Sequence, residues 1–300
     1  MLVSFIVVCI IFAFRSEHFL TITNLMNIGI YSAILGAAAT GMTIALISGG
    51  FDISVGAIMA LVSMMCAASL EDFGLSSTVA ILIGLLCGFA CGAANGALIT
   101  VTKINPLITT LATASIFRGM AYLYNNGLSV IIGNSDFKVI GRGYIGPFPI
   151  TIIIMITCFI VMGYVMKYTP LGRMIYAVGG NETASRFSGI KNDWIRFWAF
   201  TICGSMAGIG GVMLASQAGA GIPTGAIGYE MDIIAACVLG GTSIRGGKGT
   251  MIGSFFGILL LGALSNGMTL TNIPTFVQMI VKGIVLLTAV ALDNLRGGDN

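Results

Sequence analysis

Apolar segments follow one another along almost the whole chain, and they constrain the fold more than any other feature of the sequence. A helix needs about 20 apolar residues to cross the hydrocarbon core of a bilayer. Charges, prolines and glycine pairs divide the chain into ten apolar segments: 1–14, 25–48, 54–70, 77–100, 106–124, 148–166, 194–217, 230–241, 250–270 and 274–292. This pattern predicts an all-α polytopic membrane protein with about ten transmembrane helices, forming a single domain over residues 1–300. The first and eighth segments are short for a span.

Composition supports a membrane protein and excludes several other classes. Charged residues make up 8% of the chain, against roughly 25% in soluble domains. The net charge of +3 is small and dispersed, so we expect no nucleic-acid partner. The seven cysteines fall singly in apolar runs without metal-ligand spacing, and no G-x-x-x-x-G-K-[ST] loop is present to hold nucleotide phosphates. We therefore expect no metal, no cofactor and no ATP site in this chain.

The distribution of lysine and arginine predicts the orientation. Cytoplasmic loops of membrane proteins carry the excess of these residues. If the ten segments alternate in direction, the loops fall into two sets on opposite sides of the membrane. The poorer set holds only Arg15, Lys138 and Arg142. The richer set is Lys103, Lys167, Arg173, Arg186, Lys191, Arg196, Arg245, Lys248 and Arg296. Both termini are therefore predicted to be cytoplasmic.

Two internal patterns predict how the helices are arranged. "NGALITVTKINP" (95–106) and "NGMTLTNIP" (266–274) each end one segment and begin another, five segments apart. An odd offset places the two junctions on opposite sides, which indicates inverted repeats. In the fourth segment glycine recurs every four residues, at Gly84, Gly88, Gly92 and Gly96, a stripe typical of closely packed membrane helices.

The turn "SGGFDISVG" (48–56) places an aspartate between two apolar segments. The predicted orientation puts this turn near the cytoplasmic side, where Asp52 is exposed and Asp52 or Ser54 caps the following helix. Gly49 and Gly50 then end the preceding helix. A second interpretation makes Asp52 a gate residue on a solute path through the membrane. The sequence leaves both interpretations open.

The longest polar stretch lies at residues 167–193. It predicts a short amphipathic helix after Pro170, a break at Gly179 and Gly180, and a second short helix near "NETAS". A plain solvated connector is the alternative. The sequence of residues 167–193 resembles the cytoplasmic coupling loop of permease subunits of bacterial ribose/xylose-type sugar ABC importers. That loop typically reads G-R-x-x-Y-A-x-G-G-N-x-x-A-A-R-x-S-G-I. The matching residues are Gly172, Arg173, Tyr176, Ala177, Gly179, Gly180, Asn181, Ala184, Arg186, Ser188, Gly189 and Ile190, while Ser185 replaces one alanine.

Three further blocks resemble the same family: "SGGFDISVGA", "INPLITTLATASIFRGMAYL" and "GYEMDIIAACVLGGTSIRGGKGTMIGS". The resemblance implies a membrane-spanning subunit of the bacterial inner membrane without enzymatic chemistry of its own. It implies an extracytoplasmic sugar-binding protein that delivers the solute, a separate subunit that binds ATP, and a homo- or heterodimer with a second permease. A secondary sugar transporter driven by protons or sodium is the runner-up, and a passive channel is a weaker third class.

The candidate functional residues form two sets. In the family interpretation the loop docks on the ATPase through Gly172, Arg173, Tyr176, Gly179, Gly180, Asn181, Glu182, Arg186, Gly189 and Lys191, with Phe187 as a further aromatic anchor. A sugar path needs polar groups inside the membrane, where ionisable side chains are costly. The candidates are Asp52, Asn95, Asn105, Thr109, Thr110, Phe117, Arg118, Glu230 and Asp232.

Several of the path candidates also have a structural interpretation. Asn95 and Asn105 are equally typical of helix caps. Glu230 and Asp232 lie near a helix start, where carboxylates favour the dipole. Arg118 needs a partner or water within its span, and Asp52 is one conceivable partner.

Overall fold

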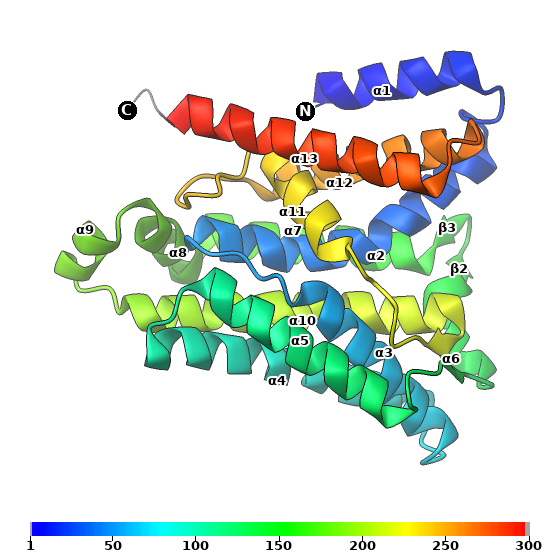
Figure 1. Ribbon diagram of the computed structural model, residues 1–300, viewed down its shortest axis with the longest axis horizontal. Coiled ribbons are helices and arrows are strands. Elements are labelled where there is room, and N and C mark those ends of the chain that lie inside the picture. The colour runs from blue at the N-terminus through cyan, green and yellow to red at the C-terminus, as the bar shows by residue number, and fades with distance from the viewer. Residues whose placement is uncertain (1, 298–300) are drawn as a thin grey trace.

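The computed structural model describes residues 2–297, with side chains through residue 291, and this part of the chain folds into thirteen helices and two small two-stranded sheets (Figure 1). The side chain of Arg296 and residues 1 and 298–300 lie outside the described residues. The helices are α1 (Leu2–Arg15), α2 (Ile22–Ile47), α3 (Val55–Glu71), α4 (Ser77–Thr102), α5 (Pro106–Tyr124), α6 (Ser135–Arg142), α7 (Ile150–Tyr168), α8 (Pro170–Gly180), α9 (Glu182–Phe187), α10 (Asn192–Ala218), α11 (Tyr229–Leu239), α12 (Met251–Leu270) and α13 (Thr275–Gly297). Strands β1 (Val130–Ile131) and β4 (Ala220–Gly221) pair antiparallel, as do β2 (Tyr144–Ile145) and β3 (Phe148–Pro149).

Each of the ten predicted apolar segments contains a helix, and the three additional helices α6, α8 and α9 lie in the loops. Five helices, α2, α4, α7, α10 and α12, are long and apolar enough to cross a membrane. Helices α1 and α3 and the apolar part of α13 are shorter, and α11 has only 11 residues. At a rise of about 1.5 Å per residue, α11 reaches roughly half of the way through a bilayer. The chain is therefore an all-α membrane protein in which not every apolar helix is long enough to be a complete span.

The long helices run side by side, and α2 lies in the middle of the bundle (Figure 1). Of the most apolar part of α2, 89% is buried, because it packs against α7, α10, α11 and α12. Helices α8 and α9 project at one end of the bundle, and α6, β2 and β3 lie at the opposite end (Figure 1). A helix that is apolar on all faces is typical of such a central position.

The glycine stripe of α4 packs against α10, as the sequence predicts. A Cβ atom on Gly92 would lie 2.7 Å from the carbonyl oxygen of Phe200 and 2.9 Å from Cα of Gly204. A Cβ on Gly88 would lie 2.6 Å from Cα of Gly208. These separations are shorter than any carbon contact allows, so the two backbones meet directly. Small residues permit this approach, and close packing is a main driving force for helix association in lipid.

We expect Gly92→Leu to destabilise the protein strongly, because the new side chain has no space between α4 and α10. Overpacking of this kind typically costs about 1–3 kcal/mol or more. Thermal unfolding in detergent, followed by size-exclusion chromatography, measures the loss. Gly119→Leu in α5 is the matched control, since no atom lies within 4 Å of a Cβ at that position. Equal melting temperatures for the two variants would contradict the tight contact.

The two junctions that resemble each other in sequence also resemble each other in structure. Lys103, after α4, and Asn272, after α12, both adopt left-handed backbone with φ of 59° and 56°. Each is followed by isoleucine, and a proline comes three residues after Lys103, at the start of α5, and two residues after Asn272, directly before α13. Figure 1 places the α4–α5 turn and the α12–α13 turn at opposite ends of the bundle. This is the arrangement that inverted repeats require.

Candidate functional site

Asp52 lies in the turn between α2 and α3, and the turn folds into the protein rather than out into solvent. Helix α2 ends in a Schellman motif, with Gly49 at φ 91° and the Gly50 N–H bonded to the Ala45 carbonyl at 3.1 Å. The Asp52 side chain is 0% exposed. The expectation that Asp52 is exposed at a cytoplasmic turn is therefore wrong: the left-handed glycine reverses the chain and directs the following residues back between α4 and α5.

The Asp52 carboxylate is held by neutral donors. Oδ1 accepts hydrogen bonds from the Ser54 N–H at 2.8 Å and the Ser54 hydroxyl at 2.5 Å. Oδ2 accepts from Nδ2 of Asn95 at 3.1 Å, and the same amide donates to the Ser54 hydroxyl oxygen at 2.8 Å. No described lysine or arginine forms an ion pair with Asp52. Ser54 occupies the N-cap position of α3, but its side chain makes no capping bond; Asp52 stabilises the helix start instead.

Asn95 and Thr110 attach this turn to two neighbouring helices. Asn95 is 0% exposed in the interior of α4, so the alternative that it caps a helix end is wrong. Its Oδ1 has no hydrogen-bond partner in the described structure. The Thr110 hydroxyl of α5 accepts from the Ile53 N–H at 3.2 Å. Asp52, Asn95 and Thr110 thus form one buried polar cluster that joins the α2–α3 turn to α4 and α5.

Asn105 and Thr109 have local roles. Asn105 is the N-cap of α5, because its side chain accepts from the Leu107 N–H at 2.9 Å. The Thr109 hydroxyl donates a hydrogen bond to the Asn105 carbonyl oxygen at 3.2 Å. Phe117 is buried in the main hydrophobic core. The structure therefore gives these three predicted path residues capping and packing contacts.

Arg118 binds backbone rather than Asp52. Its guanidinium donates to the carbonyl oxygens of Pro223 at 2.9 Å and Gly225 at 2.6 Å. The segment that carries these carbonyls runs along α3, with the Ile222 N–H donating to the Ser63 hydroxyl at 3.2 Å. The pairing of Arg118 with Asp52 is therefore not formed, because the 219–228 segment lies between α3 and α5 and offers free carbonyls.

Glu230 and Asp232 occupy the first turn of α11, as expected from the favourable interaction of carboxylates with the helix dipole. A Cβ on Gly56 would collide with a carboxylate oxygen of Glu230, so this carboxylate lies against the first turn of α3. Asp232 forms an ion pair of 2.6 Å with Lys282 of α13. Two carboxylates therefore lie at the start of α3: Asp52 just before the helix and Glu230 against its first turn.

We expect Lys282→Met alone to lower stability markedly, because it leaves the Asp232 carboxylate, 13% exposed, without its cation. Breaking a buried pair from one side costs about 3–5 kcal/mol, with some reduction here for residual exposure. The double variant Asp232→Asn, Lys282→Met should recover most of that loss. Thermal melting of the purified variants measures which of the two is more stable. A double variant that melts below the single variant would refute the predicted role of the ion pair.

The 167–193 loop folds into two short helices at one end of the bundle, as predicted, but the predicted break at Gly179 and Gly180 is wrong, because α8 continues through both glycines and the break falls at Asn181. Thr169 caps α8 by accepting from the Gly172 N–H at 3.3 Å, and Pro170 follows in the first turn. Asn181 ends α8 and caps α9, since its side chain accepts from the Ala184 N–H at 2.9 Å. Gly189 then turns the chain with φ of 82°. The amide and hydroxyl caps explain why so short a sequence forms two separate helices.

The end of α8 contacts α2 and the 243–249 loop through backbone alone. A Cβ on Gly179 would collide with the carbonyl oxygen of Ile47 and would lie 2.7 Å from the Gly247 nitrogen. The Gly247 N–H donates to the same Ile47 oxygen at 2.9 Å. A Cβ on Gly246 would lie 2.8 Å from Cα of Gly49. We call Gly49, Gly179, Gly180, Gly246 and Gly247 the glycine junction.

Tyr176 adds a side-chain contact to the glycine junction. Its hydroxyl donates to the Gly249 carbonyl at 2.8 Å, and partial burial raises the pKa of this phenol. A Cβ on Gly172 would collide with the carbonyl oxygen of Met166 at the end of α7. Four of the predicted loop residues, Gly172, Tyr176, Gly179 and Gly180, thus face the protein. Sequence reasoning missed Gly246 and Gly247, although the glycine-rich "RGGKG" was a visible signal.

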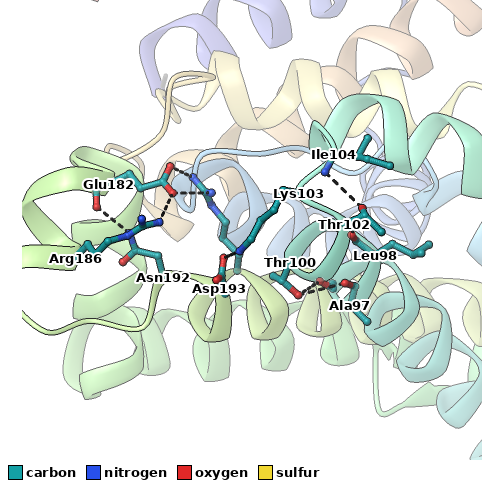
Figure 2. A network of polar contacts seen from close by, with 12 residues as sticks. Ala97, Leu98, Thr100, Thr102, Lys103, Ile104, Glu182, Arg186, Asn192 and Asp193 are labelled. Atoms are coloured by element: carbon teal, nitrogen blue, oxygen red, sulfur yellow. Dashed lines mark hydrogen bonds and ion pairs between the residues drawn. The ribbon is translucent and has the colours of Figure 1, made fainter.

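The charged residues of the loop divide into internal and exposed groups. Glu182 accepts from both terminal nitrogens of Arg196 at 3.2 and 2.7 Å and lies 3.6 Å from Arg186. Figure 2 shows this network beside the ion pair of Lys103 and Asp193, 2.5 Å apart, which links α4 to α10. Glu182 therefore attaches α9 to α10. Arg173, Phe187 and Lys191 remain exposed, and Phe187 is 88% exposed.

Two grooves open near this end of the protein. One, of about 800 Å³, lies between α4 and the start of α10 and is lined by Ala97, Thr100, Val101, Lys103, Arg186, Ile190, Lys191, Asn192, Asp193, Trp194 and Phe197. The other, of about 850 Å³, lies between α7, α8 and α12 and includes Arg173 and Tyr176. Neither groove is lined by any of the predicted path residues.

Comparisons with known proteins agree with this architecture. Residues 24–290 match the family described as the permease component of the branched-chain amino acid transport system. The ribose import permease protein RbsC of Bacillus subtilis is 41% identical over 292 residues, 97% of this chain and 90% of the relative. RbsC of Escherichia coli K12 is 38% identical over 299 residues, 98% of this chain and 93% of the relative.

The L-arabinose transport system permease protein AraH of Escherichia coli K12 is 39% identical over 296 residues, 99% of this chain and 90% of the relative. No solved structure matches this chain. The family match and the near-complete coverage of sugar permeases confirm the resemblance drawn from the loop and the three sequence blocks. The chain therefore belongs to this permease family, as a permease of the ribose/xylose-type sugar ABC importers.

Proposed function

We propose that this protein is the transmembrane subunit of an ATP-driven importer that moves a monosaccharide or a sugar-like solute into the cytoplasm. It takes the solute from an extracytoplasmic binding protein, works with a separate ATPase subunit and pairs with a second permease around one path. It performs no chemistry of its own. Relatives named as ribose and arabinose permeases support the substrate class. We also propose that all ten apolar helices lie in a bacterial inner membrane with both termini in the cytoplasm, and that the short α11 completes its span together with the segments that flank it.

One observation carries the proposal: the two-helix loop projects at one end of the bundle (Figure 1), while its glycines contact the end of the central helix α2 and the 243–249 loop. A docking partner that moves α8 moves the end of α2 with it, because the contact is backbone against backbone and no side chain can yield. The α2–α3 turn comes next in the chain after the end of α2, and it connects to α4 and α5 through Asp52 and its partners. This gives a continuous path of contacts from the loop to the membrane interior.

The transport assay that tests the proposal uses vesicles containing the permease and the ATPase encoded with it, supplied with the binding protein and labelled ribose. Uptake should require ATP on the ATPase side and should persist when proton and sodium gradients are abolished. Vesicles loaded with a non-hydrolysable ATP analogue are the control. Gradient-driven uptake without the ATPase would overturn the proposal in favour of a secondary transporter.

Phe187 is the most exposed aromatic residue of the loop, and we assign ATPase docking to it together with Arg186 and Lys191. We expect Phe187→Asp to weaken ATPase binding by at least about tenfold, since buried aromatic anchors dominate interface energies. Co-purification and uptake measure the effect. Tyr144→Asp, at an aromatic 57% exposed at the opposite end of the bundle, should leave ATPase binding unchanged. Equal effects of both variants would count against docking at α9.

A further inference from the structure

The groove between α7, α8 and α12 is large and mainly apolar. Its walls are formed mainly by apolar side chains, and its volume is about 850 Å³. The lining residues in the apolar part are Ile156, Phe159, Ile160, Gly163, Met166, Met251, Ile252 and Phe255. Helix α7 is apolar enough to span a membrane, yet only 28% of its most apolar part is buried. The groove therefore lies on an apolar face of the bundle that the rest of this chain leaves uncovered.

The floor of this groove is formed by buried side chains, and its edges are formed by exposed ones. The rings of Phe159 and Phe255 pack edge to face with centroids 5.2 Å apart. Met166 and Met251 are buried beneath it. Ile160 and Ile252, by contrast, are largely exposed along its rims. At Gly163 the missing side chain widens the groove, because a Cβ there meets only Met251, at 3.8 Å.

Two basic residues without acidic partners stand at the mouth of the groove. Lys167 and Arg173 both line it, and neither forms an ion pair with any carboxylate among the described residues. Nζ of Lys167 lies 5.2 Å from the ring centre of Tyr168, a residue type that collects at membrane interfaces. Helix α8 starts at Pro170, between them in sequence, so the positive end of its dipole adds to the field.

The groove between α4 and α10 provides a comparison at the same end of the bundle. Its Lys103 is paired with Asp193 at 2.5 Å, and its Arg186 lies 3.6 Å from Glu182. Only Lys191 is left without a carboxylate there among the described side chains. Two cations without a carboxylate partner among the described residues are therefore the distinguishing property of the α7–α12 groove.

We propose that this groove binds one anionic phospholipid, with a headgroup phosphate between Lys167 and Arg173 and an acyl chain along Phe159, Ile160 and Ile252. Basic pockets between membrane helices select anionic headgroups, and each basic residue near the surface contributes to that preference. The Tyr168 ring and the lysine stem cover the junction between headgroup and chain. The lipid fills a depression that would otherwise leave α7 and α12 imperfectly packed.

The site bears on coupling because it adjoins α8. Tyr176, which lines the groove, donates its hydroxyl to the Gly249 carbonyl near the glycine junction. A bound headgroup thus holds the start of α8 while the glycine junction holds its end. The inference itself depends on neither the transported solute nor the ATPase.

Native mass spectrometry of the full-length permease, titrated with phosphatidylglycerol or phosphatidylcholine of the same chains, tests the proposal. We expect one phosphatidylglycerol to be retained in preference to phosphatidylcholine. Lys167→Gln, Arg173→Gln should reduce that preference by about tenfold or more. Lys103→Gln, Lys191→Gln, which also removes two positive charges at this end, should preserve it. Equal loss in both double variants would overturn a specific site.

A second variant tests the apolar half of the site. Gly163→Leu fills the groove while keeping Lys167 and Arg173, and it should reduce retention of phosphatidylglycerol to the level of phosphatidylcholine. Unchanged retention would mean that the cations act without the groove and would overturn the proposal. Melting temperatures near that of the parent protein show that each variant is folded. If Lys167→Gln, Arg173→Gln loses ATPase binding but retains the lipid, the basic pair serves a protein partner and the proposal fails.

Discussion

Replacing Gly179 with alanine is expected to abolish ATP-driven uptake, although it adds a single methyl group. That methyl would collide with the carbonyl oxygen of Ile47, so α8 must move away from the end of α2. Overpacking against backbone costs about 1–3 kcal/mol or more, and here the displaced helix connects the proposed docking residues of α9 to the end of α2. We expect uptake to fall by at least about tenfold while the ATPase still binds, because Phe187 and Arg186 lie beyond the contact. Uptake and ATPase assays on the same vesicles measure both effects.

Gly180→Ala is the matched control for this experiment. The residue is the next one along the same helix, and its Cβ would lie 3.9 Å from Cα of Gly247, an ordinary contact. The two variants differ in position by one residue and carry the same chemical change. Uptake near the parent rate in Gly180→Ala with loss in Gly179→Ala would assign the effect to the contact of Gly179 with Ile47 within the glycine junction. Normal uptake in both would remove that junction from the coupling path.

Asp52→Leu is expected to lower both stability and uptake severely. The substitution leaves the Asn95 amide and the Ser54 N–H without the carboxylate that accepts from them, in a site with no access to water. Leaving buried donors unsatisfied costs about 1–3 kcal/mol for each group. The leucine also places apolar bulk in a turn that connects α2, α3 and α4. Thermal melting and uptake assays should both register the change.

Asp52→Asn separates a structural role from an ion-coupled one. The carbonyl oxygen of the new amide keeps the bonds from Ser54, and its nitrogen can donate to the unpaired Oδ1 of Asn95 once the Asn95 amide rotates to present that oxygen in place of Nδ2. We expect Asp52→Asn to retain ATP-driven uptake within about threefold and to melt near the parent protein, since polar satisfaction is preserved. A stable Asp52→Asn protein without uptake would instead favour a gate or a proton-coupled carboxylate.

The position of Asp52 explains why the two interpretations of its turn were difficult to separate in sequence. A glycine pair before an aspartate is typical of an exposed turn, and Gly49 does end α2 in that way. Whether the next residues point outward depends on the packing of α4 and α5, which are separated from the turn by more than 20 residues. The residue that binds Asp52 from α4 is Asn95, and nothing in the sequence around Asn95 indicated this pairing.

The sequence by itself determined the features that depend on local chemistry. Apolar length located all ten principal helices, a four-residue glycine period predicted the α4 packing face, and Pro170 and Asn181 marked the starts of the two helices of the loop. Each follows from propensity, capping or hydrophobicity within a few residues. The motif in that loop also identified the family.

Only the tertiary structure decided which distant groups meet. Arg118 binds the Pro223 and Gly225 carbonyls rather than Asp52, and Glu182 pairs with Arg196 of α10 as well as with its neighbour Arg186. The glycine junction joins three segments far apart in the chain. Such contacts depend on how helices cross and on which backbone groups are left free. A partner chosen by long-range packing leaves no periodic trace in a single sequence, and this is why the interior contacts emerged only from the fold.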